Sequence, residues 1–327
     1  MKKVLKILGI TLLALIVILL GAVTYISTML PNVGPAPDME VEITQERVDR
    51  GEYLANHVML CMDCHAIRDF SLFAGPPILG TMGAGGERFD QSMNFPGVFI
   101  SPNITPHNLG DWTDGEIFRL ITTGVTKDGS AIFPVMPYPN YGELDPEDIK
   151  SVIAYLRTLD PIESEPQASK PDFPFNIILN TIPKEANLQP MPDPSDQIAY
   201  GSYLVKAAAC GDCHTKAVQG KVVGEPFAGG FEFAYPDGRL NRSSNITPHI
   251  TGLGSWTKQE FVNRFKMYAD SAYVAPEIPE YAFQTVMPWE MYAGMREEDL
   301  EAIFAYLQTL EPVDNQVATF ELPSEME

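Results

Sequence analysis

Six short segments of this 327-residue chain occur twice, in the same order and about 150 residues apart. The spacing between the copies stays between 142 and 151 residues, so loops changed in length while the order of elements was kept. Such self-similarity is typical of a tandem duplication, and it predicts two related units. The paired segments are Gly51–Leu54 with Gly201–Leu204, Cys61–His65 with Cys210–His214, Asn103–His107 with Asn245–His249, Trp112–Thr113 with Trp256–Thr257, Val135–Pro137 with Val286–Pro288, and Ala154–Leu159 with Ala305–Leu310.

The repeat defines the expected domains. Eight prolines between residues 161 and 194 predict an extended, semi-rigid connector between the two copies, with the apolar piece Phe173–Leu179 packed on a domain surface. We predict an anchor at 1–30, a first domain at 41–160, a proline-rich linker at 161–195, a second domain at 196–312 and an acidic tail at 313–327.

Both predicted domains are mostly helical. Thr44, Asp145 and Asp196 are candidate N-caps, and Pro146 with two acidic residues after Asp145 strengthens that helix start. The last helix of each copy is expected to bury one apolar face, formed by Ile149, Val152, Ile153 and Leu156 in the first and by Leu300, Ile303, Phe304 and Leu307 in the second. Gly51 and Gly201 are expected to let the first helix approach this last helix at Tyr155 and Tyr306. Residues 235–238 are interpreted as a turn between two short extended pieces.

The N-terminus carries Lys2, Lys3 and Lys6 before twenty uncharged residues, 7–26. Twenty helical residues match a hydrocarbon core of ~30 Å, and the lysines favour the cytoplasmic side. We therefore predict a single-pass inner-membrane anchor with the remaining chain on the periplasmic side. A cleaved signal peptide is the alternative, although its apolar core would be shorter.

The chain is acidic, with a formal net charge of −21. Binding to nucleic acid requires clustered Lys and Arg, so this class of partner is excluded. An acidic surface favours protein partners that present a basic docking patch, and it makes their association sensitive to salt.

All four cysteines lie in two Cys-x-x-Cys-His motifs, Cys61–Cys64–His65 and Cys210–Cys213–His214. This motif attaches a c-type haem: both thiols add to the haem vinyl groups, and the histidine ligates the iron. A disulfide or thioredoxin-like pair does not explain a histidine after both motifs, and a zinc site would lack its remaining ligands. We predict two covalently bound haem c groups, on the exported side of the membrane.

The sixth iron ligand is predicted to be methionine. Met136 follows His65 by 71 residues and Met287 follows His214 by 73, each within Val-Met-Pro. Methionine with histidine is a known haem ligand pair that raises the reduction potential.

The remaining repeated histidines and tryptophans are given structural roles or left open between two roles. Of the remaining histidines, His107 and His249 occupy equivalent positions and are interpreted as loop residues bonded to backbone, since both irons have candidate pairs. Trp112 and Trp256 either donate to a haem propionate or pack in the core.

Five further stretches are characteristic of a known family: Gly224–Gly230, Ser244–Pro248, Gly124–Gly129, Met136–Tyr138 with Tyr141, and Phe173–Asn176. Through them the chain resembles the membrane-anchored multihaem cytochrome c subunits of periplasmic alcohol and gluconate dehydrogenases. The resemblance covers about residues 44–312, and it implies class I cytochrome c folds that pass electrons from a dehydrogenase toward the respiratory chain. Family members usually carry three haems, whereas this chain has two motifs.

The sequence therefore predicts a dihaem electron carrier rather than an enzyme, with no catalytic residue. Its redox partners are expected to be a dehydrogenase or quinol-oxidising complex on one side and an oxidase or soluble cytochrome on the other. Two alternatives stay open: a haem enzyme, either a dihaem peroxidase or a thiosulfate-oxidising cytochrome, and a conducting subunit of a larger respiratory complex.

Overall fold

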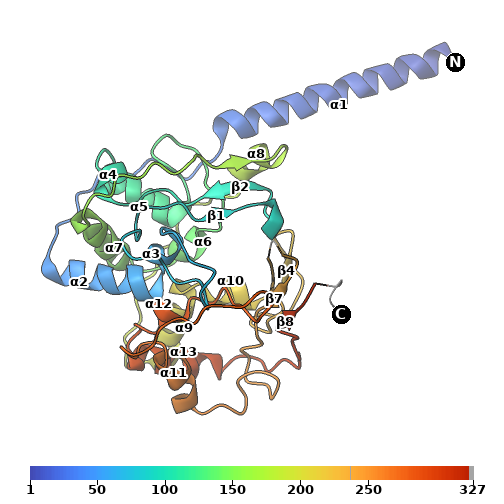
Figure 1. Cartoon of the computed structure of the whole chain (residues 1–327). Helices are drawn as coiled ribbons and strands as arrows, with labels where there is room; N and C mark the ends of the chain where they lie inside the picture. The colour runs from blue at the N-terminus through green and yellow to red at the C-terminus, as the bar shows by residue number, and fades with distance from the viewer. Residues whose placement is uncertain (236, 324–327) are drawn as a thin grey trace.

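Helix α1, Lys2–Met29, projects away from the body that holds the rest of the chain (Figure 1). The computed structural model describes residues 1–235 and 237–323. Helices dominate the body, and its strands are only two to four residues long. Within the described residues, α1 is the one helix long and apolar enough to cross a membrane, and none of its residues is buried.

The two repeats contain helices in the same order. Each begins with a helix that leads into the cysteine motif, and each ends with the helix that packs back on the first. The first repeat holds α2 (Gln45–Tyr53), a π-helical turn (Leu54–Val58), α3 (Cys61–Cys64), α4 (Pro106–Leu109), α5 (Asp114–Thr123), α6 (Tyr138–Tyr141) and α7 (Pro146–Thr158). The second holds α9 (Gln197–Ala207), α10 (Cys210–His214), α11 (Lys258–Lys266), α12 (Trp289–Tyr292) and α13 (Glu297–Leu307).

The expected helix starts and core faces are confirmed. The side chains of Thr44, Asp145 and Asp196 accept hydrogen bonds from Arg47, Glu147 and Ala199 backbone N–H groups, and so cap α2, α7 and α9. All eight residues predicted for the apolar faces of α7 and α13 are buried, each at most 8% exposed. They belong to one hydrophobic core that both repeats share.

Gly51 and Gly201 allow the close helix crossings that the sequence predicts. A Cβ at Gly51 would lie 1.9 Å from the Ser151 backbone oxygen, and one at Gly201 would lie 1.9 Å from that of Ala302. Tyr155 and Tyr306 are the next side chains that such Cβ atoms would meet. Any side chain at either glycine would therefore push α2 from α7 or α9 from α13.

Short antiparallel strands tie the linker and the C-terminal segment to the repeats. In the first repeat β2 (Gly97–Ile100) pairs with β1 (Arg88–Phe89) and with β3 (Lys170–Pro171), which belongs to the linker. In the second, β7 (Leu240–Arg242) pairs with β6 (Glu232–Ala234) and with β8 (Phe320–Glu321), which lies in the segment predicted as a tail. A separate hairpin joins β4 (Ala217–Val218) and β5 (Lys221–Val222).

The turn predicted at residues 235–238 lies between two short strands. Strands β6 and β7 are the two extended pieces expected on either side of the turn. The Tyr235 backbone N–H donates to Arg239 at 2.9 Å, and Gly238 donates to the Tyr235 carbonyl at 3.0 Å, so the chain reverses there. Residue 236 of this turn and residues 324–327 of the predicted tail lie outside the described residues.

The two repeats meet through a reciprocal pair of contacts. The Tyr53 hydroxyl donates to the Asp299 carboxylate in the other repeat, and the Tyr203 hydroxyl donates to Asp148 at 2.6 Å. Both tyrosines follow the repeated glycine by two residues, and both carboxylates lie in the first turn of the last helix. The contact is thus the same surface used twice, as in a symmetric dimer of two identical subunits.

Candidate haem-binding site

His65 and His214 have the same environment. His65 Nδ1 lies 2.7 Å from the Pro102 backbone oxygen, and His214 Nδ1 lies 2.8 Å from that of Ser244. A carbonyl only accepts, so Nδ1 carries the proton in each ring and Nε2 keeps the lone pair that a metal binds. Burial lowers the pKa of both histidines, which keeps the rings neutral at neutral pH.

The repeated Asn-Ile-Thr-Pro segment positions these carbonyl groups. The Asn103 side chain accepts from the Thr105 backbone and hydroxyl at 2.8 and 2.7 Å, and its amide donates to the Ile162 carbonyl at 2.8 Å. Asn245 makes the matching bonds to Thr247 and to Val313. Asparagine therefore fixes the loop that holds the carbonyl next to it, a role that sequence reasoning missed although the repeat of the segment marked it.

Each cysteine motif begins after a residue in the left-handed conformation. Leu60 has a φ of 55° and Ala209 a φ of 51°, an uncommon conformation for residues other than glycine. The next residues start the short helices α3 and α10, which carry both cysteines on one turn. The same backbone conformation at the matching position of both copies indicates that the chain must turn sharply where the motif begins.

The four cysteines are free thiols. Desolvation of the sulfur atoms raises the pKa of each of the four to about 12, which keeps the free thiols protonated at neutral pH. Among residues 1–235 and 237–323, no three His, Cys, Asp or Glu side chains gather as a metal cluster. All four nevertheless keep accessible surface, and Cys213 is exposed.

Met136 and Met287 occupy matching places beside the cysteine motifs. Both are half-buried against the shared core, and one proline separates each from a short helix, α6 or α12. The Tyr141 hydroxyl on α6 donates to the Met59 carbonyl at 2.8 Å, two residues before the first cysteine. Tyr292 on α12 donates to Ala208 in the same way, also at 2.8 Å. These bonds bring each methionine segment to its own cysteine motif, and ligation by the sulfur stays a prediction.

The other three histidines have different surroundings. His57 Nδ1 lies 2.9 Å from the Met291 backbone oxygen in the second repeat. His249 Nδ1 accepts from the Thr251 backbone N–H at 3.3 Å, as expected for a loop histidine, whereas His107 lies in the short helix α4.

The two tryptophans differ in their surroundings. Trp112 packs against the core with Lys127 over its ring, and Trp256 is 37% exposed. These surroundings do not decide between the two predicted roles, a hydrogen bond to a haem propionate or packing in the core.

A charged cluster distinguishes the first site from the second. Asp63, inside the first motif, lies 3.3 Å from Arg68, and both side chains are less than a tenth exposed. Burial and the Asp63 charge raise the pKa of nearby Glu87 to about 7, against the attraction of Arg68. The positions that match Arg68 and Glu87 hold Ala217 and Phe231.

Gln284 joins the second methionine segment to the first repeat. It is fully buried, its amide donates to the Phe70 and Leu72 carbonyls at 3.0 and 2.7 Å, and its oxygen accepts from Ala74. The same oxygen accepts from Thr285, whose hydroxyl accepts from the Met287 backbone N–H at 3.1 Å. No sequence signal pointed to Gln284, because its partners in the first repeat lie more than 200 residues away.

The residues present fit a haem in both repeats. A covalent haem needs two nearby thiols, a neutral histidine with a free Nε2 and a soft second ligand within reach. Both motifs supply the first two, and the tyrosine bonds place a methionine segment next to each.

Comparison with known proteins agrees with this geometry. The family model for cytochrome c matches residues 198–311. The second repeat is thus similar to a cytochrome c domain, a kind of domain that carries haem c bound covalently through a Cys-x-x-Cys-His motif like the one that begins at Cys210.

Most of the chain is similar to curated cytochrome subunits. It is 29% identical over 287 residues to the cytochrome c subunit of a quinone-dependent alcohol dehydrogenase from Gluconacetobacter polyoxogenes, covering 81% of this chain and 56% of that one. It is 27% identical to the cytochrome c subunit of gluconate 2-dehydrogenase from Pantoea cypripedii, covering 84% and 62%. A diheme c-type cytochrome of Cereibacter sphaeroides is 28% identical, covering 78% and 83%. The chain thus spans little more than half the length of the dehydrogenase subunits, and the resemblance to such subunits is confirmed.

Proposed function

We propose that this protein is a dihaem electron-transfer subunit with class I cytochrome c domains at 41–160 and 196–312. The observation that carries the proposal is the matching environment of His65 and His214, with Nδ1 on a backbone carbonyl and Nε2 free. The first repeat thus reproduces the site of the repeat that matches cytochrome c. The diheme relative, which is aligned over most of its own length, supports the count of two.

In this proposal the ligand pairs are His65 with Met136 and His214 with Met287. Bound haem supplies a one-electron couple at its iron. The protein orients each imidazole through a backbone carbonyl, supplies the thiols that fix the ring edge, and surrounds the site with a shared apolar core. Occupied axial positions leave no place for a substrate at the metal, which favours a relay over a haem enzyme.

The proposed location and partners follow from the N-terminal helix and the relatives. Helix α1, which carries three lysines in its first turns, is proposed as a retained anchor that holds the haem domains on the periplasmic face of the inner membrane. The relatives are cytochrome subunits of alcohol, fructose and gluconate dehydrogenases, so a dehydrogenase is the proposed electron donor. The respiratory chain, through an oxidase or a soluble cytochrome, is the proposed acceptor.

Removing the thiols of one repeat tests this function. Full-length protein in detergent should show two redox couples, and Cys61→Ala with Cys64→Ala should remove one of them with one haem. Cys210→Ala with Cys213→Ala is the matched variant and should remove the other couple. A variant that keeps both couples would contradict one haem per repeat.

Methionine variants test the ligands and the relay. Met136→Ala or Met287→Ala should each abolish half of the weak near-infrared sulfur-to-iron band and lower one potential. Met267→Ala, at an exposed methionine outside both sites, should leave spectrum and potentials unchanged. Fast turnover of peroxide or thiosulfate by the intact protein would favour the enzyme instead.

A further inference from the structure

The linker contains an uncharged apolar stretch with exposed side chains. Residues 173–183 have no charged member and lie between Asp172 and Lys184. Helix α8 (Phe175–Ile178) and the turn Leu179–Thr181 form its middle. Phe173 is 81% exposed and Ile178 is 46% exposed, so two large apolar side chains of one short segment have much of their surface accessible.

This stretch packs on the last turns of α1. Helix α1 contacts α8 and the turn that follows it (Figure 1). Within α1 only Val23 and Ile26 are half-buried, whereas the rest of the helix is exposed. These two residues are three apart and therefore share one face, which is the face toward α8.

The position of this contact along α1 sets its depth in a membrane. Val23 and Ile26 lie within the final turn of the uncharged run 7–26, which would fill the hydrocarbon core. A residue advances only ~1.5 Å along a helix axis, so any segment in contact with this turn lies at the boundary between hydrocarbon and headgroups. Helix α8 must therefore share that level.

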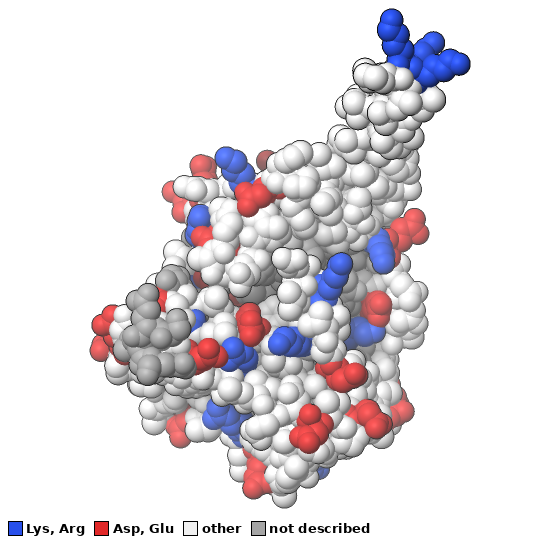
Figure 2. All heavy atoms as spheres, turned by 90° about the vertical axis from the view of Figure 1, so that its right-hand side faces the viewer, with Lys and Arg blue, Asp and Glu red and all other residues white. Residues whose placement is uncertain are grey.

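The stretch is held firmly on the body. Strand β3 directly precedes it and pairs with β2, and the Phe175 ring lies 5.5 Å from the Phe133 ring. Figure 2 shows an uncharged surface along α1, from the basic tip to the place where it joins the body. The linker therefore cannot swing away from the anchor independently of the first repeat.

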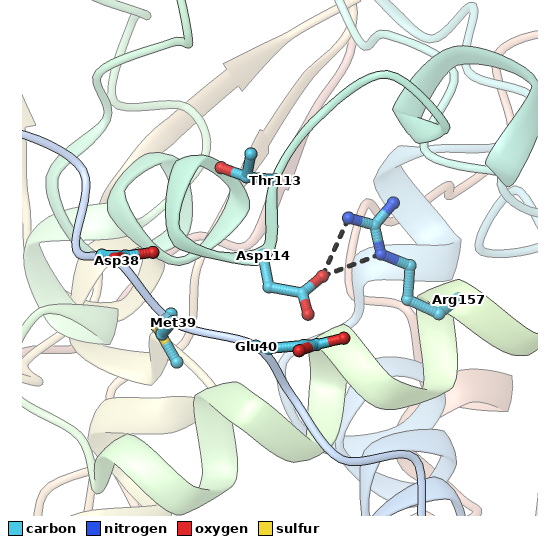
Figure 3. Close-up of a pocket in the computed structure, with 6 residues that line it drawn as sticks. All are labelled: Asp38, Met39, Glu40, Thr113, Asp114 and Arg157. Atoms are coloured by element: carbon cyan, nitrogen blue, oxygen red, sulfur yellow. Dashed lines mark hydrogen bonds and ion pairs between the residues drawn. The ribbon is translucent and has the colours of Figure 1, made fainter.

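The chain after α1 is also fastened to the body. The Val41 backbone N–H donates to the Asp114 carboxylate at 2.8 Å, and the other oxygen of that carboxylate is held by Arg157. Figure 3 shows this ion pair beside Asp38 and Glu40, in an open recess crossed by the chain. The charges of Asp114 and Arg157 compensate each other there, so the recess is an attachment of the chain rather than a binding site.

We propose that residues 173–183 form a second membrane contact, which inserts Phe173 and Ile178 into the outer leaflet of the bilayer beside α1. The occupant of this apolar surface is lipid, because the surface continues that of the anchor. Two points of attachment orient the haem domains relative to the membrane rather than leaving them on a free tether. The proposal rests on α1 being a retained anchor.

Lipid photocrosslinking on the full-length protein tests this contact. A photoreactive benzoylphenylalanine replaces Phe173, Ile178, Leu13 or Met267 in four separate variants, each reconstituted in nanodiscs of phosphatidylethanolamine and phosphatidylglycerol. Leu13 reports on the anchor, and Met267 is a 54% exposed control next to α11, at the end of the body opposite α1 in Figure 1. Haem content verifies that each variant folds.

Lipid adducts at 173, 178 and 13, with none at 267, are the expected result. Adducts at 13 but not at 173 or 178 would overturn the second contact and leave the anchor intact. No adduct at any of these three positions would overturn both. A discrete crosslinked protein at 173 in native membranes, in place of lipid, would also overturn the inference, since the surface would then belong to a protein interface.

Discussion

The first and second repeats surround their cysteine motifs with the same backbone-directed bonds but with different charges. In both, a histidine Nδ1 lies on a carbonyl, an asparagine fixes that carbonyl, and a tyrosine joins the methionine segment to the motif. In the first repeat Asp63 pairs with Arg68 near the half-buried Glu87, whereas the second repeat keeps Asp212 at the first of these positions and has alanine and phenylalanine at the other two.

The comparison separates the bonds that both proposed haem sites share from the charged groups found in one repeat only. In the proposed dihaem protein, bonds to the backbone recur because both copies must offer a haem the same geometry. Arg68 instead donates to the Ala74 and Gly75 carbonyls, and so holds the loop that Gln284 of the second repeat also binds. Arg68 therefore supports a loop through which the two copies contact each other.

The largest expected effect comes from the helix crossings, where the repeats are alike. Gly51→Leu or Gly201→Leu should each destabilise its own repeat by about 3 kcal/mol, because the new side chain meets a backbone oxygen. Denaturant unfolding followed at each haem measures the loss. Glu52→Leu places the same side chain at the next, exposed position and should have little effect. Equal stability of Gly51→Leu and Glu52→Leu would contradict the crossing.

A smaller effect should separate the two reciprocal contacts. Tyr53→Phe removes a donor from buried Asp299 and should cost about 2 kcal/mol. Tyr203→Phe should cost about 1 kcal/mol, because Asp148 keeps two bonds from Arg50 at 2.7 and 2.8 Å.

Equilibrium unfolding of both variants measures this difference. Tyr235→Phe is the control, since its ring is in the body but its hydroxyl makes no bond within the described residues. A larger loss for Tyr203→Phe than for Tyr53→Phe would show that the Arg50 pair does not compensate.

Local patterns predicted much of this arrangement. The spacing of Ile149 and Val152 identified a buried helix face, Thr44 and Asp196 identified helix starts, and the repeated Gly51 identified a close crossing. These features depend on residues within one or two turns, or on two copies that agree.

Contacts between the copies could not be predicted in the same way. In the sequence Tyr53 looks like any buried aromatic residue, and its carboxylate partner is 246 positions away. Gln284 is an ordinary polar residue in sequence and becomes a buried link only once the repeats dock. Strands β3 and β8 are two residues long, too short for a periodic signal.

A pH dependence should arise from Glu87, whose matching position in the second repeat holds Phe231. The pKa of Glu87 is raised from 4.5 to about 7, so between these values the folded state holds more protons than the unfolded state. Stability should therefore fall as pH rises from 5 to 7 and then level off. Glu87→Gln should flatten this slope in thermal unfolding monitored from pH 5 to 8. An unchanged slope in the variant would assign it to other groups.

Haem stoichiometry tests the central claim, that each repeat holds one covalent haem, most directly. Pyridine haemochrome absorbance of the purified full-length protein, combined with its intact mass, counts the groups per chain. The account predicts two haems, because two complete motifs share one geometry. One haem per chain, carried by the second repeat alone, would contradict it and would make the first repeat a structural copy that has lost its cofactor.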